Sequence, residues 1–165
     1  MNRPGGAGRA AERLVHLASP GGAVRATVDR HGGGLHSLTY RGEPLVRTYD
    51  AAGPVPYCAG SVLFPWPNRV RGGVWSEGTS RHRLAITDPE LGNANHGLVL
   101  DAWFDVAGPG ADRVVVSTVV EPQRGFPFRL ALDITYRVDD TGLIVEHTIR
   151  NLGGPDIAAL IWDKI

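Results

Sequence analysis

The clearest signal in the chain is an alternation of apolar and polar positions between residues 130 and 138. One set of alternate positions holds Leu130, Leu132, Ile134, Tyr136 and Val138, and the other holds Ala131, Asp133, Thr135 and Arg137. A period of two indicates a β-strand with one buried face. Four turn-forming residues follow at 139–142, and a mainly apolar run then extends from Leu143 to Ile149. We therefore predict a hairpin whose second strand returns antiparallel to the first.

Shorter stretches of the same kind recur along the chain. Predicted strands cover Val24 to Val28, Leu35 to Tyr40, Leu45 to Val46, Arg83 to Ile86, Trp103 to Val106 and Arg113 to Val120, with a polar hairpin from Val74 to His82. Glycine- and proline-rich turns, such as those at 31–34 and 41–44, separate them. The run from Arg113 to Val120 is apolar on both faces, which indicates an interior strand. Helical periodicity of useful length is absent from the sequence, so the pattern predicts an all-β protein built as an antiparallel β-sandwich.

Composition narrows the class of protein. The 165 residues carry 17 Lys and Arg against 17 Asp and Glu, so we expect no nucleic-acid partner and no attraction to an anionic membrane. A lone cysteine, Cys58, forms no internal disulfide, and the N-terminus lacks the apolar block of a signal peptide. We therefore expect a cytoplasmic protein. We also expect a flexible N-terminal extension over residues 1–13 and one domain over residues 14–165.

Two short segments carry the polar chemistry. The first runs from Phe64 to Gly73 as Phe-Pro-Trp-Pro-Asn-Arg-Val-Arg-Gly-Gly, and the second runs from Gly92 to Gly97 as Gly-Asn-Ala-Asn-His-Gly. The two prolines hold the first segment extended. Amide and guanidinium groups donate hydrogen bonds to hydroxyls, aromatic rings offer apolar faces, and an imidazole can donate or accept a proton. This set of groups fits a neutral polyol such as a sugar.

The two segments, in this order and spacing, resemble the aldose 1-epimerase family, the galactose mutarotases and their relatives. The likeness extends from about Val24 to Gly153, through the glycine turn at 33–34, the Phe-Pro-Phe at 126–128 and the Asn-Leu-Gly at 151–153. The resemblance implies a large antiparallel β-sandwich of the galactose-mutarotase type, a supersandwich, here incomplete at the C-terminus. It also implies a sugar site in a groove across one face of the sandwich.

The same resemblance implies the chemistry. The family interconverts the α and β anomers of an aldohexose, galactose or glucose-like, by acid/base ring opening, with no metal or organic cofactor. It implies that Asn68 and Arg69 bind sugar hydroxyls and that His96 is both a substrate-binding and a catalytic residue. The family's second histidine, a sugar-binding aspartate and a glutamate base lie later in its sequences, and no histidine follows His147 here. We therefore expect a truncated or frame-shifted chain that is inactive alone.

Several alternatives stay open from the residues. The chain could be a non-catalytic carbohydrate-binding sandwich, or its sugar could be phosphorylated, since Arg69, Arg71 and Arg81 would fit a phosphate. Trp66 could be core or a stacking platform. We interpret His147 as a core or interface histidine, and we expect no metal site at His31 and His36. Nothing in the sequence indicates the oligomeric state.

Overall fold

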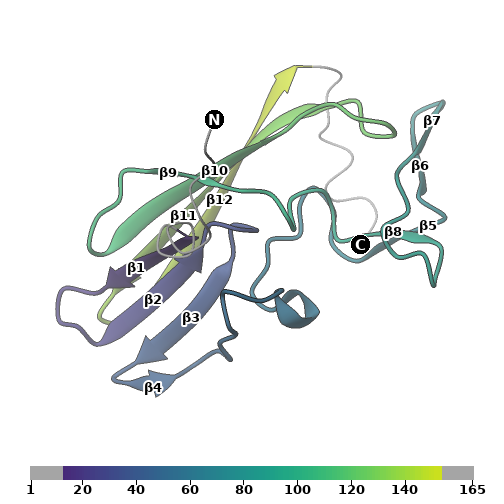
Figure 1. Cartoon of the computed structure of the whole chain (residues 1–165). Helices are drawn as coiled ribbons and strands as arrows, with labels where there is room; N and C mark the ends of the chain where they lie inside the picture. Colours follow the sequence, from purple (N-terminus) through teal and green to yellow (C-terminus); the bar gives the residue numbers. More distant parts are fainter. Residues whose placement is uncertain (1–12, 154–165) are drawn as a thin grey trace, which may run out of the picture.

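The computed structural model describes residues 13–153, and two four-stranded antiparallel sheets lie face to face in it (Figure 1). The first sheet has the order β1 (Leu14–Ala18), β2 (Val24–Asp29), β3 (Leu35–Tyr40), β4 (Glu43–Pro44). The second has the order β12 (Gly142–Gly153), β11 (Arg129–Asp139), β10 (Arg113–Val120), β9 (Asp105–Ala107). The predicted all-β antiparallel sandwich is confirmed. No helix in the described part of the chain has the length and apolar character needed to span a bilayer.

The core lies between the two sheets, where β2 packs against β11 and β12 and β1 packs against β10 and β11. The apolar row of β11 is buried as the alternation predicts, and Leu130 and Ile134 are wholly inaccessible to solvent. Burying each such side chain stabilises the fold by roughly 1.5–3 kcal/mol. Tyr136, in the same row, donates its hydroxyl to the backbone oxygen of Gly33 at 2.9 Å, and its burial raises the pKa of the phenol. This bond ties β11 to the turn that precedes β3.

A buried carboxylate fastens the start of β1 to the end of β2. Asp29 is fully buried and accepts hydrogen bonds from Arg13 Nε at 2.7 Å and Arg13 Nη2 at 2.6 Å. It also accepts the Tyr49 hydroxyl at 3.0 Å and the backbone N–H of His31 at 2.9 Å. Burial, and then the charge of Asp29, raise the pKa of Tyr49 to about 12. Four donors therefore compensate one desolvated charge.

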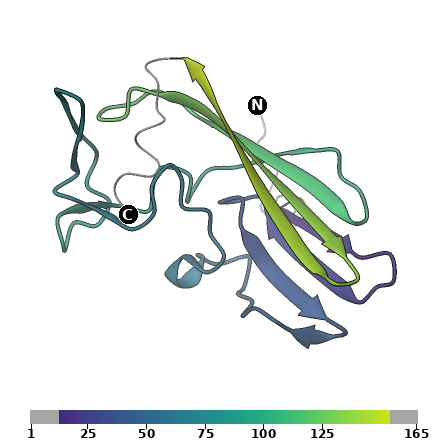
Figure 2. The ribbon, with the colours of Figure 1, turned by 180° about the vertical axis from the view of Figure 1, so that it is seen from behind.

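Two small ladders lie beyond one end of the sandwich in both Figures 1 and 2. They pair β5 (Arg69–Arg71) with β8 (Asn93–Asn95), and β6 (Val74–Glu77) with β7 (Ser80–Arg83). Trp75 of the β6–β7 hairpin packs on the buried ring of Phe128, which in turn contacts Phe126, and its indole N–H donates to the Gly125 oxygen at 2.9 Å. His82 stacks on Trp75 with ring centroids 4.3 Å apart. An aromatic cluster thus anchors this end of the molecule.

Strand β12 is an edge strand of its sheet, and its ribbon crosses in front of the first sheet in Figure 2. Val145, His147 and Ile149 pair directly with Tyr136, Ile134 and Leu132 of β11, so they share the face that points inward. Val145 is nevertheless 42% exposed and Ile149 38% exposed. The inner face of β12 is therefore only partly covered by the first sheet.

The structure corrects three predicted strands. The pairing near residue 45 involves Glu43–Pro44 rather than Leu45 and Val46, because the turn is completed at Arg41 and Gly42, both at positive φ. The strand predicted from Arg83 to Ile86 is not formed as such, because Arg83 is the last residue of β7. The strand predicted to start at Trp103 is β9, which begins at Asp105. The pattern singled out no strand at β1, β5 or β8.

The predicted strands at β2, β3, β10, β11 and β12 and the hairpin β6–β7 are confirmed, the structure extending several of them by one or more residues. The predicted N-terminal extension lies, for residues 1–12, outside the described residues, and Arg13 forms the ion pair with Asp29.

Candidate functional site

The short ladder β5–β8 brings the two polar segments together. Arg69 lies opposite Asn95, Val70 opposite Ala94, and Arg71 opposite Asn93. Because alternate residues of a strand point to opposite faces, the central pair faces one way and the polar residues face the other. Ala94 is 1% exposed and Val70 packs against the core, so the polar face is turned away from the core. The sequence thus presents Arg69, Arg71, Asn93 and Asn95 on one surface.

Asn68 and His96 lie just beyond that ladder and bond to each other. The backbone N–H of His96 donates to the Asn68 carbonyl at 3.0 Å, and the backbone N–H of Asn68 donates to Nδ1 of the imidazole at 3.1 Å. Since Nδ1 accepts this bond, a neutral His96 ring carries its proton on Nε2. The imidazole is therefore held as a donor through Nε2.

Both of these residues have an unusual backbone conformation. The φ angle is +56° at Asn68 and +60° at His96, in the left-handed region that residues other than glycine rarely adopt. The surrounding pairing holds them there, with Leu98 donating its N–H to the Phe64 oxygen at 2.7 Å. Such conformations cluster at binding and catalytic sites, so this strain favours a functional role for the two positions.

Arg69 is held by groups on either side of it. Its Nε donates to Oδ2 of Asp88 at 2.9 Å, and its Nη1 donates to Oδ1 of Asn68 at 3.4 Å. Asp88 is itself fixed, because its backbone exchanges two hydrogen bonds of 3.0 Å with Asn93. The result is a continuous polar row of Asp88, Arg69, Asn68 and His96. The structure therefore brings together all three residues that the sequence singled out, and it adds Asp88, which the sequence analysis missed.

Trp66, two residues before Asn68, is part of the core packing rather than an exposed platform. It is partly buried, packs against the core and lies 6.0 Å from Phe126 between ring centroids. Within residues 13–153, the Trp66 indole Nε1 and the Asn95 Oδ1 are buried atoms for which the structure gives no hydrogen-bond partner. Asn95 is the residue paired with Arg69, so polar groups without a partner adjoin the row.

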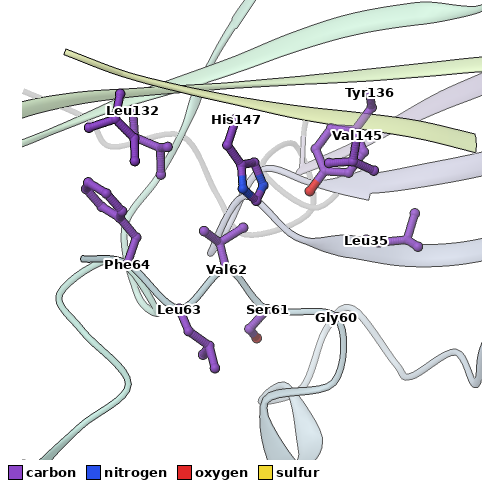
Figure 3. Close-up of a pocket in the computed structure, with 11 residues that line it drawn as sticks. Leu35, Gly60, Ser61, Val62, Leu63, Phe64, Leu132, Tyr136, Val145 and His147 are labelled. Carbon is purple, nitrogen blue, oxygen red and sulfur yellow. The ribbon is translucent and has the colours of Figure 1, made fainter. Parts of the chain in front are cut away.

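A separate cavity of about 310 Å³ lies beneath the inner face of β12 (Figure 3). Its walls are Leu35, the segment 60–64, Leu132, Tyr136, Val145, His147 and Ile149. Figure 3 shows the His147 ring pointing from β12 toward Val62, between Phe64 and Val145. The lining does not include Asn68, Arg69 or His96, although Phe64 contributes to the cavity and also bonds to Leu98. The polar row is thus a surface site next to an apolar cavity.

His31, in the turn between β2 and β3, and His36, on β3, have structural contacts. His31 packs on Trp103 with ring centroids 5.3 Å apart, and His36 lies with Nε2 at 2.8 Å from the Tyr49 oxygen. Residues 13–153 contain no group of three or more His, Cys, Asp or Glu side chains placed to hold a metal ion.

Comparison with known proteins gives the class first. The fold matches a galactose mutarotase-like protein from Clostridium acetobutylicum with a TM-score of 0.74 at 21% identity, over 85% of this chain and 46% of that one. It also matches a galactose 1-epimerase from Lactobacillus acidophilus with a TM-score of 0.62 at 21% identity, over 76% of this chain and 41% of that one. The architecture is therefore the galactose-mutarotase type of β-sandwich.

The sequence then gives the family. Residues 13–159 match the aldose 1-epimerase family, and the uncharacterized protein YihR of Escherichia coli K12 is 33% identical over 144 residues. That match covers 86% of this chain and 46% of YihR, so the chain spans about half the length of this relative. The chain belongs to the aldose 1-epimerase family.

Proposed function

We propose that this chain binds the pyranose ring of an aldohexose through Asn68, Arg69 and His96, as part of a site that interconverts sugar anomers. The observation that carries the proposal is the hydrogen-bonded row that joins these three residues, Arg69 Nη1 to Asn68 and Asn68 N–H to His96. The galactose 1-epimerase of Lactobacillus acidophilus shares the fold, which makes galactose and glucose the sugars to test first.

Each group has a role that follows from its bonds. Asn68 uses Oδ1 to accept from Arg69, so its amide N–H groups are left to donate to a hydroxyl. Arg69 uses Nε for Asp88, so the outer edge of its guanidinium, with Nη2, is left for a second hydroxyl. His96 would donate from Nε2 to a sugar oxygen and would help with the charge that develops there during ring opening.

Anomer interconversion needs an acid and a base, and the row supplies one imidazole. Proton transfer by a positioned side chain typically contributes about 10²–10⁴-fold to a rate. We therefore propose that residues 13–153 bind the sugar but do not accelerate its anomer exchange by themselves. The second candidate function, a non-catalytic carbohydrate-binding sandwich, is favoured by the same observation, since Asp88, the carboxylate of the row, is already bound to Arg69. Location in the cytoplasm stays a prediction.

Exchange spectroscopy of galactose or glucose tests whether the chain binds the sugar and whether it accelerates anomer exchange. The rate of α-to-β exchange is measured by NMR with wild-type protein and with His96→Ala. Binding without acceleration supports the proposed sugar binding and inactivity of the chain, an outcome that the carbohydrate-binding function shares. Acceleration that disappears in His96→Ala supports the isomerase and contradicts the proposed inactivity. Absence of both binding and acceleration overturns the proposed function.

A further inference from the structure

We infer that Asp88 is a positioning residue that orients Arg69 and makes the site select neutral hexoses over hexose phosphates. The inference rests on the proposed function and adds the substrate class to it. Three observations carry it: the carboxylate's fixed position, its bond to one particular edge of the guanidinium, and the charge balance of the row.

The position of Asp88 is fixed by backbone pairing. Its N–H and C=O bond to the C=O and N–H of Asn93, the first residue of β8, each at 3.0 Å. Asn93 in turn lies opposite Arg71 of β5. The Asp88 side chain is 18% exposed, whereas that of Arg69 is 46% exposed. The more buried partner, whose backbone is paired, therefore sets the geometry of the more exposed one.

The bond to Nε determines which edge of the guanidinium remains available. Asp88 Oδ2 accepts a hydrogen bond from Arg69 Nε at 2.9 Å, and Asn68 Oδ1 accepts one from Arg69 Nη1 at 3.4 Å. The planar group is thus held by two contacts that are not collinear, which defines its plane. An unrestrained arginine would lose side-chain freedom when a ligand binds, and a restrained one has already lost it. Pre-ordering of this kind favours a weakly bonding neutral ligand.

The pair also sets the charge of the site. Arg69 carries one positive charge and Asp88 one negative charge at a separation of 2.9 Å, so this pair itself offers a phosphate no net charge, and Arg71 on the same face of the ladder keeps its own positive charge. Opposite charges at this distance partly cancel the attraction felt by a dianion a few ångströms further away. Replacing Asp88 by a neutral residue removes the cancellation and leaves an unpaired arginine, which is the common phosphate-binding side chain.

The test compares Asp88→Asn, Asp88→Glu and a matched control, Glu90→Gln, which removes an exposed negative charge two residues away. Affinities for galactose and for galactose 6-phosphate are measured by NMR titration of the whole chain. Asp88→Asn should weaken galactose binding about three- to tenfold, from the ordering cost of one long side chain. It should also shift the ratio of affinities toward the phosphate, while Asp88→Glu restores part of the galactose affinity and Glu90→Gln leaves both unchanged.

A second measurement tests, in the absence of ligand, whether Asp88 orders the Arg69 side chain. The Nε–Hε signal of Arg69, assigned by its loss in Arg69→Lys, should report a rigid group in the wild type and an averaged one in Asp88→Asn. Unchanged Arg69 dynamics and an unchanged affinity ratio in Asp88→Asn would overturn the inference. Wild-type protein that binds neither sugar overturns the proposed function instead, and the Arg69 signal still decides whether Asp88 orients that side chain.

Discussion

Gly97 lies directly against the backbone of Phe64, and substituting it should push the two polar segments apart at this contact. A Cβ atom added at Gly97 would lie 2.1 Å from the Phe64 oxygen, 2.4 Å from its carbonyl carbon and 3.0 Å from its nitrogen. These are backbone atoms, so no side chain can rotate out of the way. Gly97 also has a φ of +76°, which a residue with a Cβ adopts only under strain.

Gly92 offers a matched control for the size of the effect. Its φ is +65°, yet a Cβ there would meet nothing within 4 Å. Both alanine variants carry the cost of the left-handed backbone, about 1–2 kcal/mol. Only Gly97→Ala adds the overlap with Phe64, and overpacking of this kind costs about 1–3 kcal/mol. Gly97→Ala should therefore lose about 1–3 kcal/mol more in unfolding free energy than Gly92→Ala.

Urea unfolding followed by tryptophan fluorescence measures this difference. The chain has four tryptophans, and Trp75 lies in the core with Trp66 packed against it, so loss of this packing on unfolding is visible. Because Gly97 follows His96, the amide signals of Asn68 and His96 should also shift in Gly97→Ala and stay in place in Gly92→Ala. Equal losses in the two variants, within about 0.5 kcal/mol, would refute the close packing of Phe64 on the His96 turn.

Two further predictions concern the buried carboxylate of the first sheet. Asp29→Asn should cost about 3–5 kcal/mol of unfolding free energy, because Arg13 is left with a neutral partner in a buried site. The control Asp105→Asn, at an exposed position of β9, should change the unfolding free energy little. Similar urea midpoints for the two variants would contradict this prediction. Tyr49 has a pKa raised from 10.0 to about 12, so the neutral phenol stabilises the fold fully below pH 10 and this contribution is lost as the pH rises through 12. Unfolding free energy measured from pH 9 to 12 should fall less steeply in Tyr49→Phe than in the wild type, and parallel curves would exclude this role for Tyr49.

Long strands could be predicted from the sequence because their alternation is repeated many times. Strand β11 offers nine alternating positions between Leu130 and Val138, and all five members of the row that starts at Leu130 are buried. Strands β5 and β8 have three residues each, too few for a period of two to stand out. The pair at Glu43–Pro44 was missed for a related reason, since its position depends on how tightly the turn at Arg41 and Gly42 closes.

The site shows the same division. Asn68, Arg69 and His96 stood out because their segments resemble a family pattern, and the structure brings them into one row. Asp88 gave no signal, because the preference of an Asp-Pro pair for a turn says nothing about which distant side chain the carboxylate will meet. Its contact depends on the register of β5 and β8 together with the bridge between Asp88 and Asn93, which place Asp88 Oδ2 2.9 Å from Arg69 Nε, 19 positions away in the sequence. Contacts of this kind follow from tertiary pairing alone.

The central claim is that Asn68, Arg69 and His96 bind one sugar ring together. Chemical-shift mapping of the ¹⁵N-labelled chain during a galactose titration tests it most directly. The account predicts that the NMR signals of the Asn68 side-chain amide, the Arg69 Nε–H and the His96 amide shift with one common dissociation constant. The signals of residues that line the cavity beneath β12 should not shift. Shifts confined to that cavity, or separate constants for the three residues, would contradict it.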